Sequence, residues 1–416
     1  MNDLQYLPRL LAPVVERALA GFPVVVLTGA RQTGKTTLAQ HLPSAGNRVF
    51  RSLDDLRTLE QAEHEPDLLV QEAERLTLDE VQRAPDLLRA VKRAVDARRR
   101  NGRFLLTGSA NLLLMRQVSE TLAGRAVYLR LAPLTQGERA GGGGNPPWAA
   151  LLAAAGADAA LRALEACSAW RGRWPEAVLE GGYPPVRSLA AEERARWFEG
   201  YVTTYLERDL QQIASIGALT DFRRLLRIAA LRLGGLLNQA DLARDAGLTR
   251  PTTHRYINLL EVSFQVRKLA PYAVNPTTRL VKSPKLYWND SGLAAHLAGF
   301  SDANELRNDP RCGAYLENLL LCELDAWREC EAPRPEIYYS RTTADVEVDF
   351  VLEHKRRLLP IEVKASSRAR AADARALEHF LDTHAQARWG LLVHAGADLY
   401  RLSPHVVAAP LALLLA

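Results

Sequence analysis

The chain has 416 residues, of which 48% are apolar and 24% charged, a composition typical of a globular protein with two to four domains. Its net charge of +5 permits contact with phosphate backbones without requiring it. No apolar run approaches the ~20 residues that span a bilayer, no secretory signal pattern is visible, and the four cysteines lack CxxC spacing, so we expect a cytoplasmic protein without a membrane partner, a zinc site or a disulfide framework.

Four short apolar runs separated by helical patterns predict the first domain, residues 1–140. Strands are expected at 23–28, 48–53, 75–79 and 103–108. Strands that alternate with helices form βαβ units. We therefore predict an α/β fold with a mostly parallel sheet that helices cover on both faces.

The segment GARQTGKT at 29–36 fits the pattern G-x-x-x-x-G-K-[ST] at every fixed position. In such a loop backbone N–H groups surround the β-phosphate of a nucleotide, Lys35 reaches its β- and γ-phosphates, and the Thr36 hydroxyl ligates Mg²⁺. An apolar strand precedes the loop and a helix follows it, as a P-loop requires. We predict ATP and Mg²⁺ as cofactors. The predicted nucleotide-binding residues are Gly29, Ala30, Arg31, Gln32, Thr33, Gly34, Lys35, Thr36 and Thr37.

An apolar strand that ends in Asp79 and Glu80 supplies the second part of this site. We predict that Asp79 and Thr36 hold the metal ion and that Glu80 is the general base for the attacking water. The strand at 103–108 should lie between the acidic-pair strand and the P-loop strand. It would present Ser109 or Thr107 to the water or γ-phosphate; a simple turn is the alternative. The predicted catalytic residues are Lys35, Glu80 and Ser109.

Four stretches carry a family resemblance: GARQTGKTTL, LTLDEVQRAPDLL, FLLTGSANLLL and LAGRAVYLRLAPLTQGE. They resemble a large prokaryotic family of AAA+-superfamily ATPases whose members carry a C-terminal domain of unknown function, and the resemblance covers nearly the full length. It implies ATP binding and hydrolysis. Arg116 and Arg125 are candidates for a transition-state arginine, and neither is favoured.

Four glycines and two prolines within 140–148 mark the end of the first domain. We expect a linker and helical region at 141–215 and a winged-helix-like domain at 216–300. In the latter, one helix closes at Gly247, and a second begins with Thr249 as its N-cap. A strand after these helices would complete a winged helix-turn-helix.

In a DNA-binding domain of this kind the second helix faces the major groove or its phosphates. The side chains that would make these contacts are Arg250, Thr252, Thr253 and Arg255. A packing module with the same layout and no DNA contact is the alternative.

The last region, 301–416, places carboxylates on neighbouring strands. Asp349 lies in one predicted strand and Glu362 in the next, with Lys364 on the same face as Glu362. This D-x(n)-E-x-K arrangement resembles the PD-(D/E)xK metal-dependent nucleases, and Glu317 would match a helical acid that many of them add. We predict a C-terminal α/β restriction-endonuclease-like domain, either an active nuclease or an inert or binding core.

These observations predict a Mg-dependent, ATP-hydrolysing AAA+-type protein that acts as a switch or motor on DNA. Two alternatives stay open: a nucleotide-gated regulatory module that binds another protein, and an ATP-gated metal-dependent nuclease. Double-stranded DNA, another protein and a second copy of the chain are the partners left open.

Overall fold

The chain consists of two compact units of contacting residues. Unit 1 is Met1–Pro133 with Leu259–Gln265, and unit 2 is Leu134–Asn258 with Val266–Ala416. The boundaries predicted at residues 140, 215 and 300 stay predictions. The computed structural model describes residues 6–109, 122–142, 146–209, 219–275, 279 and 282–415.

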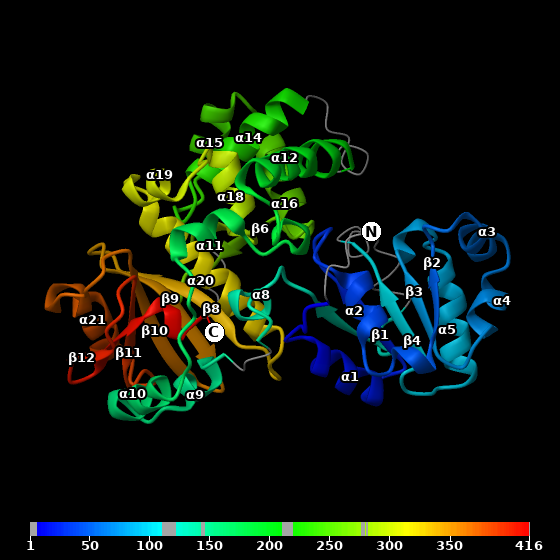
Figure 1. Ribbon diagram of the computed structural model, residues 1–416, viewed down its shortest axis with the longest axis horizontal. Helices are drawn as coiled ribbons and strands as arrows, with labels where there is room; N and C mark the ends of the chain where they lie inside the picture. The colour runs from blue at the N-terminus through cyan, green and yellow to red at the C-terminus, as the bar shows by residue number, and fades with distance from the viewer. Residues whose placement is uncertain are drawn as a thin grey trace. The chain divides into compact units, whose positions relative to one another are not determined.

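Unit 1 is built on a five-stranded parallel sheet with the order β2-β3-β4-β1-β5 (Figure 1). Strand β4 lies between the acidic-pair strand β3 and the P-loop strand β1, which confirms the predicted order. The fifth strand was not predicted, because it is a partly buried strand whose short apolar run lies between two arginines. The strands are β1 (Val24–Thr28), β2 (Val49–Ser52), β3 (Leu76–Asp79), β4 (Phe104–Thr107) and β5 (Ala126–Arg130).

The core of unit 1 forms where amphipathic helices meet the central strands. Every residue of β1, β3 and β4 is buried, as in a parallel sheet covered on both faces. Helix α5 contributes Leu88, Val91 and Val95, which recur at helical spacing and share one core cluster with the sheet. The helices are α1 (Ala12–Gly21), α2 (Lys35–His41), α3 (Leu56–His64), α4 (Pro66–Gln71) and α5 (Leu87–Ala97), with short 3-10 turns η1 (Ala45–Asn47) and η2 (Val81–Arg83).

Unit 2 contains a six-stranded mixed sheet with the order β12-β13-β11-β10-β9-β8. Helix α21 packs on β9, β10 and β11, and their apolar side chains form a single core cluster. Every residue of the last strand, β13, is buried. The strands are β8 (Glu336–Arg341), β9 (Glu347–His354), β10 (Arg357–Lys364), β11 (Gly390–His394), β12 (Tyr400–Ser403) and β13 (Val406–Pro410).

The rest of unit 2 is mainly helical, as expected for the middle of the chain. Gly247 closes α15 in the left-handed conformation, and the Thr249 hydroxyl accepts from the Thr252 N–H at the start of α16, so both predicted helix ends are confirmed. Two antiparallel strands follow, β6 (Val266–Leu269) and β7 (Lys285–Trp288). The helices are α8 (Gln136–Arg139), α9 (Trp148–Ala153), α10 (Ala157–Glu165), α11 (Trp174–Glu180), α12 (Ala191–Tyr201), the π-helix η4 (Val202–Asp209), α14 (Leu219–Leu231), α15 (Gln239–Ala246), α16 (Arg250–Val262), α18 (Ser291–Ala298), α19 (Ala303–Asn308), α20 (Cys312–Arg328) and α21 (Arg375–Thr383), with 3-10 turns η3 (Pro184–Val186), η5 (Ala371–Ala374) and η6 (Leu411–Leu413).

A buried carboxyl group on α20 joins two parts of unit 2 that are distant in sequence. Oε1 of Glu323 accepts a hydrogen bond of 2.8 Å from the Gln136 N–H at the start of α8. Burial raises the pKa of Glu323 to about 8. Between about pH 4.5 and 8, Glu323 is therefore protonated in the folded chain and ionised in the unfolded chain.

We expect Glu323→Gln to weaken the pH dependence of stability, because glutamine mimics the protonated acid. In the wild type this proton makes the free energy of unfolding fall as pH rises from 5 to 8, by up to ~1.4 kcal/mol per pH unit. Urea unfolding of both proteins at pH 5, 6, 7 and 8 measures the two slopes. The exposed Glu336→Gln is the control, and parallel curves for Glu323→Gln and wild type would contradict the assignment.

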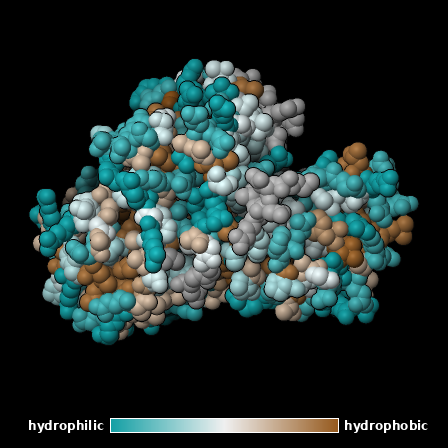
Figure 2. Space-filling view, viewed as in Figure 1, coloured by the Kyte–Doolittle hydropathy of each residue, from teal (hydrophilic) through white to brown (hydrophobic). Residues whose placement is uncertain are grey.

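None of the described helices has the length and apolar character needed to cross a membrane. On the face drawn in Figure 2, hydrophilic residues predominate and hydrophobic residues gather only in small groups. The apolar runs of β1, β3 and β4, on which three of the strand predictions rest, are buried throughout.

Candidate nucleotide-binding site

The loop between β1 and α2 has a backbone that only glycine fits at two points. Gly29 has φ 143°, and a Cβ placed there would lie 2.4 Å from the carbonyl oxygen of Leu131. Gly34 has φ 90° and stands directly before Lys35, the first residue of α2. Side chains at either position would strain or displace the loop. The two fixed glycines of the motif are thus explained by the fold of unit 1.

The Lys35 ammonium lies within this loop. Its Nζ donates hydrogen bonds to the carbonyl oxygens of Gly29 (3.1 Å) and Ala30 (2.8 Å). Burial lowers the pKa of Lys35 to about 8, and the nearby carboxylates of Glu80 and Asp79 offset only part of this effect. A buried ammonium held by two weak carbonyl acceptors is ready to bind an anion.

Asp79 at the end of β3 accepts hydrogen bonds from hydroxyl groups on three elements. The Thr36 hydroxyl lies 3.0 and 3.1 Å from its two carboxylate oxygens, and Ser52 donates at 3.3 Å. Thr107 at the end of β4 also donates to Asp79. By contrast, Ser109 is fully buried and its hydroxyl has no hydrogen-bond partner among the described residues. Of the two predicted candidates, Thr107 is therefore the one that contacts the acidic pair.

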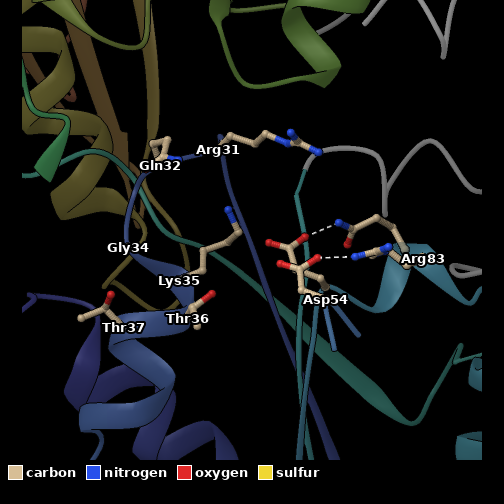
Figure 3. A pocket seen from close by; sticks show the side chains of 10 residues that line it. Arg31, Gln32, Gly34, Lys35, Thr36, Thr37, Asp54 and Arg83 are labelled. Atoms are coloured by element: carbon tan, nitrogen blue, oxygen red, sulfur yellow. Dashed lines mark hydrogen bonds and ion pairs between the residues drawn. The ribbon is translucent and has the colours of Figure 1, made fainter. Parts of the chain in front are cut away.

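Glu80 follows Asp79 in the left-handed conformation, with φ 55°. Its carboxylate accepts a hydrogen bond from the Gln82 amide and faces a cavity of about 630 Å³. Figure 3 shows Lys35 and Thr36 on one side of this cavity and Asp54 and Arg83, an ion pair of 2.6 Å, on the other. The lining residues are Arg31, Gln32, Gly34, Lys35, Thr36, Thr37, Asp54, Glu80, Gln82 and Arg83.

Five residues of this site were absent from the prediction: Arg9, Ser52, Asp54, Gln82 and Arg83. Gln82 and Arg83 stand two and three residues after Glu80 in the sequence, and this proximity would have identified them. The other three are distant from both motifs in sequence and carry no local signal.

Arg9 holds the P-loop from outside the motif. Its guanidinium is 7% exposed and donates to the carbonyl oxygens of Thr33 (2.8 Å) and Ala132 (2.6 Å). One planar group thus ties the phosphate-binding loop to the segment that follows β5. Because Arg9 does not line the cavity, it positions the loop without contacting a ligand there.

We expect Arg9→Ala to lower the affinity for ATP about tenfold, because the loop loses a buried support, and to lower the free energy of unfolding by ~1–3 kcal/mol. Titration calorimetry at a temperature where the variant is folded measures the affinity. Arg17→Ala, an exposed arginine on α1, is the matched control. An affinity unchanged in Arg9→Ala would show that the support is dispensable.

Two arginines, Arg116 and Arg125, were candidates for transition-state stabilisation. Arg116 lies outside the described residues. Arg125 pairs with Asp96 at 2.5 Å on the surface of unit 1 and does not line the cavity. No described contact therefore assigns either arginine to the nucleotide site.

The predicted C-terminal residues come together in unit 2. Asp349 and Glu362 lie on the antiparallel neighbours β9 and β10, and the Lys364 ammonium is 2.6 Å from Glu362 Oε1. Glu317 on α20 accepts from the Tyr287 hydroxyl at 2.9 Å. Burial and the charge of Asp349 raise the pKa of Glu317 and of Glu362 to about 8. The sequence therefore predicted the grouping of these side chains; their chemical role stays a prediction.

Helix α16 presents only part of the predicted DNA-contacting set. Arg250 and Arg255 are exposed and Thr252 is half-buried. Thr253 is fully buried and its hydroxyl donates to the Thr249 carbonyl at 3.1 Å, so the prediction that it contacts DNA is wrong. A threonine at this point of an amphipathic helix faces the core and satisfies its hydroxyl within the helix.

Three known protein families match parts of the chain. An AAA domain family matches residues 21–140, which include the whole P-loop and both acidic residues. Two families described as domains of unknown function follow: DUF8612 matches residues 171–304 and DUF4143 matches residues 312–414. The AAA domain precedes the DUF4143 domain, and the family resemblance likewise places an ATPase domain before a C-terminal domain of unknown function.

Among solved structures, the chain resembles the Walker-type ATPase PABY2304 of Pyrococcus abyssi, with 15% identity, a TM-score of 0.43, and 69% of this chain and 94% of that chain covered. It also resembles Cdc6p of Pyrobaculum aerophilum, with 13% identity, a TM-score of 0.25, and coverage of 70% and 95%. These scores are too low to support an argument on function.

Two relatives have a higher sequence identity to the chain. They are the uncharacterized proteins Rv2008c of Mycobacterium tuberculosis and Mb2031c of Mycobacterium bovis, each 34% identical over 399 residues that cover 95% of this chain and 82% of the relative. The chain therefore belongs to their family, and it combines an N-terminal ATP-binding AAA domain with a C-terminal DUF4143 domain.

Proposed function

We propose that unit 1 binds ATP together with Mg²⁺ and hydrolyses it. The observation that carries this proposal is the contact between the Thr36 hydroxyl and both carboxylate oxygens of Asp79, at 3.0 and 3.1 Å. A hydroxyl at the start of α2 and a carboxylate at the end of β3 form the hard oxygen donor set that suits Mg²⁺. Bound there, Mg²⁺ would neutralise charge on the β- and γ-phosphates.

The residues around this pair have separate tasks in the proposal. The Lys35 ammonium exchanges its two carbonyl partners for phosphate oxygens, which are stronger acceptors. Glu80, which lines the cavity, takes a proton from the attacking water. Thr107 and Ser52 hold the Asp79 carboxylate in place through their hydroxyl groups.

Phosphate release from ATP by the purified chain tests this proposal. We expect turnover that requires Mg²⁺ and stops when EDTA removes it, because both proposed ligands act through the metal ion. Turnover that continues at full rate in EDTA would contradict the assignment of Thr36 and Asp79.

We further propose that the hydrolytic cycle acts as a switch or motor on double-stranded DNA. The support is the exposed pair Arg250 and Arg255 near the N-terminal end of α16, within the helix–turn–helix and two-stranded layout of α15, α16, β6 and β7. Guanidinium groups on such a helix suit phosphate and guanine contacts. A nucleotide-gated module that binds another protein is the competing function.

The two functions separate in one assay. We expect double-stranded DNA to stimulate ATP turnover in the wild type, and the stimulation to be lost in Arg250→Ala/Arg255→Ala. Arg244→Ala, an exposed arginine on α15 that pairs with Asp241, is the matched control and should retain it. Turnover that is indifferent to DNA in the wild type would favour the protein-binding module.

A further inference from the structure

Lys285 on strand β7 places its ammonium among a cluster of acidic side chains of the C-terminal domain, which includes Glu317, Glu347 and Asp349. Lys285 lies within the stretch matched by the 171–304 family, whereas the carboxylates belong to the stretch matched by the 312–414 family. Its side chain is 5% exposed. Its Nζ lies 2.5 Å from Glu347 Oε1 and 5.6 Å from the centre of the Tyr339 ring. All these residues belong to unit 2.

The Lys285 ammonium is held in this position by its ion pair with Glu347, and the acidic residues Glu317 and Asp349 also face it. An ammonium is a compact cation with three donors, so it balances several carboxylates from one point. The site therefore already contains a fixed positive charge.

The acids that a metal-dependent nuclease would need are engaged in other contacts. A backbone N–H of β10 donates to Asp349 Oδ2, Lys364 donates to Glu362 Oε1, and Tyr287 donates to Glu317 Oε2. Within the described part of the chain, no three His, Cys, Asp or Glu side chains converge in a way that would hold a metal ion. The residues present do not fit a divalent cation as they are arranged.

One carboxylate oxygen among these acids nevertheless has no hydrogen-bond donor in the described part of the chain. Glu362 is 6% exposed, and its Oε2 has no hydrogen-bond partner among the described residues. A buried carboxylate oxygen without a donor is costly unless a cation lies nearby. For Glu362 the nearby cation is Lys364, and for Glu347 it is Lys285, so two lysines supply the positive charge among these acids.

We propose that the Lys285 ammonium takes the place of a divalent cation in this carboxylate site, so that the wild-type domain binds no metal ion there, and that removing the ammonium opens the site. A divalent ion beside the ammonium meets like-charge repulsion in a poorly solvated site. Without the ammonium, Glu347 loses its ion-pair partner and Asp349 a facing positive charge, so these two carboxylates are free to turn toward a metal ion. Carboxylate oxygens are the ligands that Mg²⁺ and Mn²⁺ prefer.

Mn²⁺ binding to the whole, nucleotide-free chain tests this proposal by electron paramagnetic resonance of the free ion. We expect Lys285→Met to gain one Mn²⁺ site relative to wild type and to lose it again in Lys285→Met/Asp349→Asn. Lys282→Met, an exposed lysine three residues earlier, should gain none. Any Mn²⁺ held by the P-loop is common to all four proteins and cancels in the comparison.

Thermal unfolding gives a second measure. Lys285→Met should unfold at a lower temperature than wild type, and Mn²⁺ should restore part of the difference in this variant and not in the double variant. If Lys285→Met does not fold, Lys285→Gln provides the neutral side chain with polar donors.

Two results would overturn the proposal. One is a Mn²⁺ site in the wild type that Asp349→Asn abolishes, a comparison that requires no change at Lys285. The other is a folded Lys285→Met or Lys285→Gln protein that gains no Mn²⁺ site.

Discussion

Lys35→Ala is expected to abolish measurable ATP binding, with a loss of affinity of about a hundredfold or more. The ammonium lies within the P-loop, where it donates to the carbonyl oxygens of Gly29 and Ala30. Charged hydrogen bonds of this kind contribute ~1.5–3 kcal/mol each, and a hundredfold loss corresponds to about 2.8 kcal/mol. Titration calorimetry with ATP and Mg²⁺ measures the affinity, and Lys92→Ala on α5, outside the cavity, is the matched control.

The same variant should be folded and at least as stable as the wild type. A pKa lowered from 10.5 to about 8 means that the folded chain disfavours the charged form, so the ammonium opposes folding at neutral pH. Alanine removes this unfavourable charge. Stability that is retained while binding disappears separates a lost phosphate contact from a lost fold. Binding retained in a folded Lys35→Ala protein would contradict the role assigned to the ammonium.

Local sequence signals predicted the core of unit 1 well. Strands β1, β3 and β4 are short apolar runs that a parallel sheet buries on both faces, so a continuous run is enough to place them. The P-loop follows from glycines whose positive φ no other residue adopts without strain. The grouping of Asp349, Glu362 and Lys364 followed from strand alternation alone.

The missed residues act through contacts between distant parts of the chain. Arg9 contacts a carbonyl 24 residues away and another 123 residues away, and no local pattern encodes such distances. Lys285 precedes the carboxylates that surround it and lies in a different family match. In the case of Ser109 and Thr107, the end of a strand was predicted correctly but the side chain that faces Asp79 was decided by packing.

Glu80→Gln is expected to bind ATP with nearly wild-type affinity and to lose turnover by a factor of about 10²–10⁴, the usual contribution of a general base. Glutamine keeps the size of the side chain and its acceptor toward Gln82, but it cannot take a proton from water. Phosphate release under saturating ATP measures turnover, and calorimetry measures affinity. Asp86→Asn, a carboxylate in the following loop that does not line the cavity, is the matched control.

The backbone at Glu80 supplies an independent reason to expect this result. A non-glycine residue at φ 55° costs of order 1–3 kcal/mol unless the surroundings impose it. Glycine would relieve the strain, yet this position carries a long acid that the turn directs into the cavity beside Lys35 and Thr36. Glu80→Gly should therefore raise the free energy of unfolding while turnover falls as far as in Glu80→Gln. Unchanged turnover in either variant would remove Glu80 from the mechanism and leave its strained backbone without a function.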